Sequence, residues 1–140
     1  MSQIILENCT LLDGTSPELR EGIHVLVEGD RIREVSDTPI SSSGARVIDL
    51  KGQTLMPGLI DAHVHLIATS LNLGQLAHEP ASLTTARARH IAEGMLQRGF
   101  TSIRDAAGAD WGLAAAIDQD LFYGPRVFYA GRALSQTGGH

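Results

Sequence analysis

Apolar strands alternate with helical stretches from residue 59 onward, and this alternation restricts the possible fold more than any other feature of the chain. Strands are expected at residues 59–65, 100–104 and 126–130, and helices at about 82–98 and 111–120. A strand–helix–strand order of this kind builds a parallel sheet with helices packed on it. The pattern therefore predicts an α/β fold for this part of the chain.

The first of these helices has recognisable ends. Ser82 is expected to be its N-cap, because a hydroxyl can accept a hydrogen bond from a free backbone N–H of the first turn. Gly99 is expected at the C′ position, where the backbone commonly turns left-handed. The residues expected to form the apolar stripe of the helix are Leu83, Ala88, Ile91, Ala92, Met95 and Leu96.

Residues 1–56 have a different pattern, with short extended runs separated by turn residues. Gly29 and Asp30 form a two-residue hairpin turn between runs at 23–28 and 31–35, and His24 is expected to be half-exposed on this hairpin. Further short strands are expected at 4–7, 46–49 and 53–56. The pattern predicts a small β-sandwich or another β-rich subdomain at residues 1–56, followed by a second domain at 57–140.

Composition excludes several classes of protein. The net charge is −5 and the basic residues are scattered, so the chain lacks the basic surface that nucleic-acid binding requires. No apolar run reaches the ~20 residues of a membrane-spanning helix, so no membrane association is expected. Cys9 is the single cysteine and is expected to fill space within a strand. A cytoplasmic protein follows from these features.

The chemistry concentrates at the end of the expected strand 59–65. Side chains two residues apart point to the same face of a strand, which aligns Asp61, His63 and His65. The apolar residues Ile60, Ala62 and Val64 should face the covering helices instead. Two imidazoles and a carboxylate are costly to bury without partners, and a metal ion supplies a partner. Imidazole is a preferred ligand of zinc and neighbouring divalent metals.

The run Pro-Gly-Leu-Ile-Asp-Ala-His-Val-His at 57–65 resembles the signature of the amidohydrolase superfamily. The segments 99–105, 124–127 and 137–140 are similar to its prolidase-like and imidazolonepropionase-like branch. The resemblance implies an N-terminal β-subdomain followed by a (β/α)8 barrel of TIM type, of which residues 57–140 supply the first three βα units. Since three parallel strands cannot close a barrel, the remainder of the barrel is expected beyond residue 140.

The resemblance also implies roles for individual residues. His63 and His65 would hold one or two divalent metal ions, with zinc as the leading candidate and manganese, iron or cobalt as alternatives. Asp61 would support the site by orienting a ligand or anchoring the strand. His140, after a glycine-rich run, is the candidate substrate contact. No catalytic acid or base is located in this sequence, and the bridging lysine and catalytic aspartate of binuclear relatives would follow residue 140.

Four other polar residues carry weaker expectations. Arg104 and Asp105 either face the site or form an internal salt bridge. His90 is expected on a solvated helix face. His78 lies in a loop that could cover a ligand.

The resulting functional hypothesis is a metal-dependent hydrolase that cleaves a C–N amide bond with metal-activated water. The expected substrate is a small molecule such as an Xaa-Pro dipeptide or an N-acyl amino acid. One alternative is a cyclic-amide hydrolase of imidazolonepropionase type with a mononuclear site, and another is a non-catalytic structural or regulatory subunit of the same fold. A homo-oligomer is compatible with this hypothesis.

Overall fold

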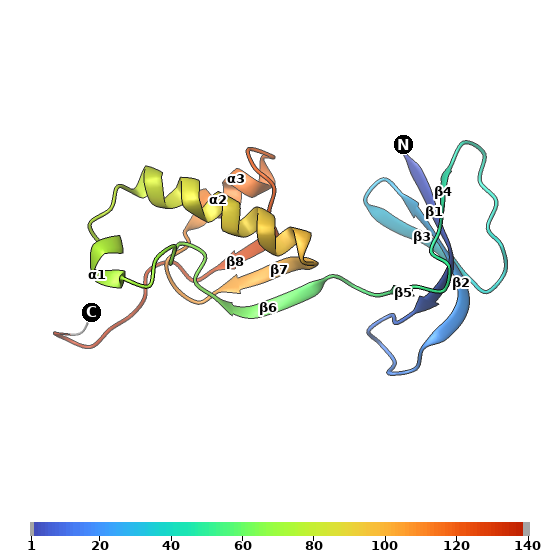
Figure 1. Ribbon diagram of the computed structural model, residues 1–140, viewed down its shortest axis with the longest axis horizontal. Helices are drawn as coiled ribbons and strands as arrows, with labels where there is room; N and C mark the ends of the chain where they lie inside the picture. The colour runs from blue at the N-terminus through green and yellow to red at the C-terminus, as the bar shows by residue number, and fades with distance from the viewer. Residues whose placement is uncertain (1, 139–140) are drawn as a thin grey trace. The chain divides into compact units, whose positions relative to one another are not determined.

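The computed structural model describes residues 2–138, and the chain divides into two compact units, Met1–Pro57 and Gly58–His140 (Figure 1). The first unit contains the strands β1 (Gln3–Leu11), β2 (Arg20–Glu28), β3 (Arg31–Ser36), β4 (Arg46–Asp49) and β5 (Thr54–Leu55). The second unit contains β6 (Leu59–Val64), α1 (Leu73–Leu76), α2 (Ala81–Gln97), β7 (Phe100–Asp105), α3 (Trp111–Asp118) and β8 (Arg126–Tyr129).

The strands of the first unit form one five-stranded sheet. Its order is β3-β2-β1-β4, and β5 also pairs with β1. The pairs β1–β2 and β2–β3 are antiparallel, whereas β4 and β5 run parallel to β1. The expected β-sandwich is therefore wrong for residues 2–57, whereas the alternative of a β-rich subdomain is confirmed. The physical reason is the length of β1, which offers its first half to β4 and its second half to β5 and so keeps both short strands in its own sheet.

His24 also departs from expectation, since it is buried in β2 with 7% of its surface exposed. Residues 23–26 are buried in succession. Both faces of β2 are therefore covered at this point, and the alternation of exposed and buried residues that the prediction assumed is lost. The Nδ1 atom of His24 has no hydrogen-bond partner among the described residues.

Cys9 occupies the core of this sheet together with Leu11, Ile23 and Val25, as expected of a residue that fills a strand. The thiol is fully buried and donates a hydrogen bond to the Ile23 carbonyl oxygen over 3.1 Å. Burial raises the pKa of the Cys9 thiol, because the low-dielectric surroundings disfavour the thiolate.

We therefore expect Cys9 to resist alkylation in the folded protein. Only the thiolate reacts, and both burial and the raised pKa reduce its availability at pH 8. Iodoacetamide labelling followed by peptide mass spectrometry should find Cys9 unmodified in buffer and fully modified in denaturant. Rapid stoichiometric labelling of the native protein would contradict this assignment.

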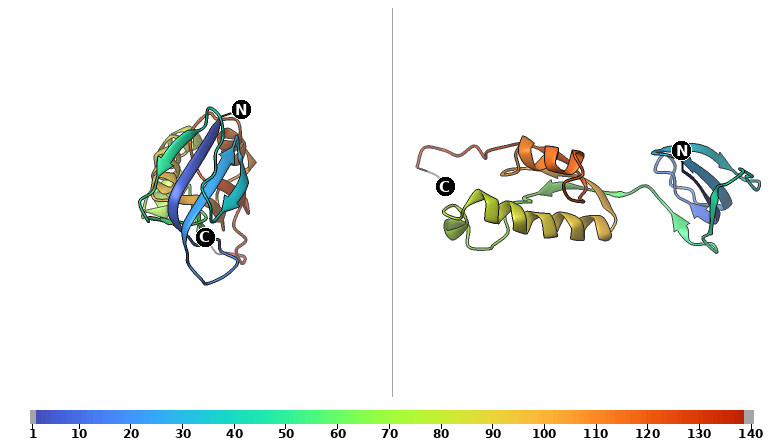
Figure 2. Two further views of the ribbon diagram at one scale, coloured as in Figure 1. Left: turned by 90° about the vertical axis from the view of Figure 1, so that its right-hand side faces the viewer. Right: turned by 90° about the horizontal axis from the view of Figure 1, so that it is seen from above.

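The second unit is a three-stranded parallel sheet covered by helices, which confirms the predicted order of strands and helices. The sheet order is β6-β7-β8. Along the chain, α2 connects β6 to β7 and α3 connects β7 to β8. Both helices lie on the same side of the strands in Figure 1, and the view from above in Figure 2 separates them. The buried core brings Ala88 and Ala92 of α2 against Ile103, Leu113 and Val127. The short helix α1 was not predicted.

The two ends of α2 differ in how well the sequence predicted them. Gly99 has φ +91, which confirms its place just beyond the helix in left-handed backbone. Ser82 is not the N-cap, because α2 begins at Ala81 and Pro80 caps it without a side-chain hydrogen bond. The Pro80 carbonyl accepts from the backbone N–H groups of Leu83 and Thr84. Proline suits this position, since its fixed φ fits a helix start and it has no N–H to satisfy.

The buried face of α2 is also shifted relative to the predicted stripe. Leu83 is 42% exposed, whereas the neighbouring Thr84 is buried and directs its hydroxyl to the Pro80 carbonyl oxygen over 3.5 Å. A local hydrogen bond of this kind allows a threonine on the apolar face of a helix, and helix propensity alone does not predict such a bond.

Among the helices of residues 2–138, none is both long and apolar enough to cross a membrane.

Gly58, at the start of the second unit, is required by close packing on β7. A Cβ atom at this position would lie 2.7 Å from the Cβ of Thr101, and closer still to the two outer atoms of that side chain. Thr101 cannot easily rotate away, because a β-branched side chain on a strand has a restricted χ1. We expect Gly58→Ala to lower the free energy of unfolding by about 1–3 kcal/mol, as overpacking typically does.

Urea unfolding of the two proteins measures this difference, with Gly74→Ala as the matched control. Gly74 lies in α1, and an added Cβ would meet only the Asn72 side chain at an ordinary 3.6 Å. The control should be neutral or slightly stabilising, by up to about 1 kcal/mol. Equal stability of Gly58→Ala and the wild type would show that the β7 contact is not tight.

Candidate metal centre

β6 carries Asp61 and His63 and ends one residue before His65, and its pairing with β7 is irregular. The register pairs Asp61 with Ile103 and Val64 with Asp105, and it shifts between these two pairs. The regular pairing assumed for the row of Asp61, His63 and His65 is therefore interrupted, since a register shift of this kind disturbs the two-residue alternation of a strand.

The apolar residues of β6 match the prediction only in part. Val64 packs against the helix-covered core, as expected, but Ile60 is 71% exposed. A second register shift, between Leu59 and Ile60, lies at this end of the strand.

His63 and His65 remain together despite the irregular strand. Their ring centroids lie 5.2 Å apart with an interplanar angle of 73°. Both side chains are exposed, so a ligand can reach the two rings from solvent. Asp61 accepts a hydrogen bond from the backbone N–H of His63 over 3.1 Å, which fastens the carboxylate to the strand at the first of the two histidines.

The ring of His65 is held by the loop that follows β7. Its Nδ1 lies 3.0 Å from the carbonyl oxygen of Ala107. A carbonyl oxygen can only accept, so Nδ1 donates in this hydrogen bond, and in the neutral form of the ring the lone pair is then on Nε2. A backbone carbonyl on the second ring nitrogen is the usual arrangement behind a metal-ligating histidine. The residues present therefore fit a divalent metal bound through the free nitrogens of the imidazole pair.

Asp105 lies next to this arrangement and is fully buried. Its Oδ2 accepts from the Leu66 N–H over 2.6 Å, and its Oδ1 accepts from the Ala109 N–H over 3.1 Å. Neither Arg104 nor Asp105 forms an ion pair with any residue in the described range, so the salt bridge considered for them is absent there. Arg104 is exposed on the strand instead.

The other predicted residues do not join the pair. His140 lies outside the described residues. His78 is exposed after α1, and His90 is exposed on α2 within 3.9 Å of Glu93, as expected for a solvated helix face. No group of three or more potential metal-ligating side chains comes together within residues 2–138. The described part of the chain thus offers two candidate ligands, fewer than a complete metal site needs.

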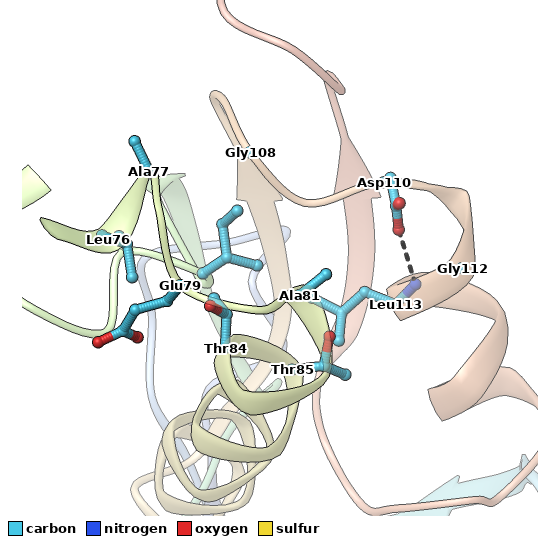
Figure 3. Close-up of a pocket in the computed structure, with 11 residues that line it drawn as sticks. Leu76, Ala77, Glu79, Ala81, Thr84, Thr85, Gly108, Asp110, Gly112 and Leu113 are labelled. Atoms are coloured by element: carbon cyan, nitrogen blue, oxygen red, sulfur yellow. Dashed lines mark hydrogen bonds between the residues drawn. The ribbon is translucent and has the colours of Figure 1, made fainter. Parts of the chain in front are cut away.

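A cavity of about 660 Å³ adjoins the loops after β6 and β7. Figure 3 shows Leu76, Ala77 and Glu79 on one side of it, and Asp110 and Leu113 at the start of α3 on the other. Ile67 and Gly108 also line it, and they closely follow His65 and Ala107 in the chain. Its volume is in the range of small-molecule sites.

The sequence profile of the amidohydrolase family matches residues 46–136, a range that includes β6, both histidines and the loops beside them. This match covers more than half of the chain. The protein belongs to the amidohydrolase family.

Two curated relatives illustrate its range. Ochratoxinase of Aspergillus niger is 43% identical over 90 residues, which cover 61% of this chain and 18% of that protein. Imidazolonepropionase of Anaeromyxobacter sp. (strain K) is 36% identical over 64 residues, which cover 42% of this chain and 15% of that protein. The chain therefore spans less than a fifth of the length of these relatives.

Solved structures match over nearly the whole chain. A crystal structure of an amidohydrolase has a TM-score of 0.94 and 52% identity, covering 99% of this chain and 34% of the other. A prolidase complexed with N-methylphosphonate-L-proline has a TM-score of 0.93 and 47% identity with the same coverage of both chains. A Xaa-Pro dipeptidase with bound methionine has a TM-score of 0.82 and 29% identity, covering 99% of this chain and 36% of the other.

Proposed function

We propose that this chain forms part of a metal-dependent hydrolase that cleaves a C–N amide bond, with Xaa-Pro dipeptides or N-acyl amino acids as substrates. The observation that carries the proposal is the histidine pair, whose rings lie 5.2 Å apart while the Ala107 carbonyl holds Nδ1 of His65. Both imidazoles are exposed to solvent, where a metal ion can reach them. Zinc is the leading metal, since imidazole is among its preferred ligands.

The catalytic fold of the proposal is a (β/α)8 barrel. The repeating unit of such a barrel is a strand followed by a helix, and three consecutive parallel strands with helices on one face match three such units. The outer strands β6 and β8 carry exposed apolar residues, with Ile60 71% and Phe128 58% exposed, as expected of a sheet that has further neighbours. Active sites of these barrels lie at the carboxyl ends of the strands, where β6 places His65.

The chemistry would divide between the metal and the chain. A divalent metal supplies a strong nucleophile from water at neutral pH and polarises the substrate carbonyl. His63 and His65 would hold it through their free ring nitrogens. Asp61 and the Ala107 carbonyl would fix the approach of the two histidines, one through the His63 backbone and the other through the His65 ring.

The substrate class is supported by the similar proteins. The prolidase at 47% identity was solved with a phosphonate carrying L-proline, and ochratoxinase shares 43% identity over its matched segment. The adjoining cavity of about 660 Å³ has room for the side chain of a dipeptide or acyl amino acid. Cyclic-amide hydrolysis is the second candidate, because imidazolonepropionase is also among the relatives.

Metal content tests the first part of the proposal. We expect purified full-length protein to contain one or two equivalents of a divalent metal by elemental mass spectrometry, and the His63→Ala, His65→Ala double variant to lose it. His90→Ala is the matched control, since that side chain is 83% exposed on α2 and should leave metal content unchanged.

The number of equivalents separates the two enzymatic candidates. Two equivalents support a binuclear amide hydrolase, whereas one favours the cyclic-amide reaction. A metal-free wild-type protein, purified without chelator and unable to take up added zinc, would overturn the metal-hydrolase proposal.

Substrate turnover tests the second part. We expect hydrolysis of Xaa-Pro dipeptides or N-acyl amino acids by the metal-loaded protein, measured by release of the free amino acid. His63→Ala should lower kcat/KM by more than about 100-fold, because losing a ligand costs more than the 10–100-fold typical of a supporting residue. Turnover of cyclic amides alone would shift the assignment to the second candidate.

A further inference from the structure

We infer that Asp105 is a positioning residue for the metal site, which it serves by holding the backbone on both sides of the His65 hydrogen bond. The inference rests on the proposed metal site. Asp105 reaches no metal-facing position itself, because its carboxyl group is fully buried and both of its oxygens accept from backbone N–H groups.

The connectivity is direct. Oδ2 of Asp105 binds the N–H of Leu66, the residue immediately after His65. Oδ1 binds the N–H of Ala109, two residues after the Ala107 carbonyl that accepts from the His65 ring. One carboxyl group therefore fixes both the backbone that carries the imidazole and the loop that orients it.

Both oxygens of Asp105 lie within hydrogen-bonding distance of their donors, 2.6 Å from Leu66 N and 3.1 Å from Ala109 N. A fully buried carboxyl group without an ionic partner in the described range depends on these two N–H donors for its stabilisation. Moving either loop would leave the group unsatisfied, so the two loops are held in one arrangement.

The Ala107 loop has further support from the loop after β8. Gly108 donates to the Gly131 carbonyl over 2.7 Å, and Gly131 donates to the Ala109 carbonyl over 3.2 Å. The His65 ring itself is exposed, where a lone hydrogen bond to Ala107 would compete with water. Its orientation thus depends on how well the acceptor is held, and Asp105 provides the side-chain anchor.

Asp105→Asn and Asp105→Ala test this inference in the full-length protein. Asparagine has nearly the same size, but its NH2 group would face one of the two N–H donors and lose that bond. Both variants should bind zinc at least about 10-fold more weakly in competition with a chromophoric chelator, in the range known for residues that orient metal ligands.

Two controls separate positioning from general stability. Met95→Ala creates a cavity in the core of α2, away from the loops, and should lower stability while leaving zinc affinity within twofold. Asp49→Asn alters a carboxylate that also accepts a backbone N–H, from Lys51 over 2.9 Å, but lies in the other unit, so zinc affinity should not change.

The tautomer of His65 gives a readout independent of metal and activity. In metal-free wild-type protein with ¹⁵N-labelled histidine, NMR should find the proton of His65 on Nδ1, and the Asp105 variants should show a mixture. His63 should be unchanged, because its ring makes no such bond in the described structure.

The outcomes distinguish this inference from the proposed function. Unchanged zinc affinity and an unchanged His65 tautomer in a folded Asp105→Asn protein would overturn the inference alone. A wild-type His65 that carries its proton on Nε2 would overturn it even if both variants failed to fold. A wild type with the expected tautomer but no metal binding would instead overturn the proposed function.

Discussion

The hydrogen bonds from Asp105 to the backbone of two neighbouring loops are the interaction on which the candidate site depends. Burying a carboxyl group costs several kcal/mol unless donors compensate it, so the fold must place Leu66 N–H and Ala109 N–H against it. The helix-covered core makes this possible, because Ile103, two residues earlier on β7, is fully buried beneath α2 and α3. Core packing fixes the position of β7. Asp105, on β7, in turn fixes the backbone next to His65 through its hydrogen bond with Leu66 N–H.

Much of the fold could be predicted from the sequence, because periodicity reports burial on one face of an element. The order of strands and helices after residue 59 and the left-handed Gly99 were predicted correctly. Errors arose where a tertiary contact overrode the local pattern. His24 is buried because both faces of β2 are covered, and the expected sandwich fails because β1 is long enough to pair with both β4 and β5.

The candidate site divides in the same way. The two-residue spacing of His63 and His65 predicted that the imidazoles lie together, and their ring centroids are 5.2 Å apart although His65 follows the last residue of β6. The irregular pairing of β6 was not predictable, because register shifts depend on the partner strand. Asp105 was the residue that sequence reasoning left undecided. Its hydrogen-bond donors are backbone N–H groups, one of them 39 residues away in the chain. Nearly every residue has such a group, so the side chains in the sequence do not indicate which ones bind Asp105.

The bonds between the loops after β6, β7 and β8 have a consequence for how such a protein can diversify. Apart from Asp105, the residues that hold the His65 ring contribute only main-chain atoms, namely Leu66, Ala107, Gly108, Ala109 and Gly131. Main-chain groups are the same in nearly every amino acid. Leu66 and Ala109 are fully buried, and Gly108 and Gly131 have φ of +113 and +80, so these four positions restrict their side chains. Among these residues, Ala107 can therefore be exchanged for a new substrate contact while its carbonyl oxygen still holds the His65 ring.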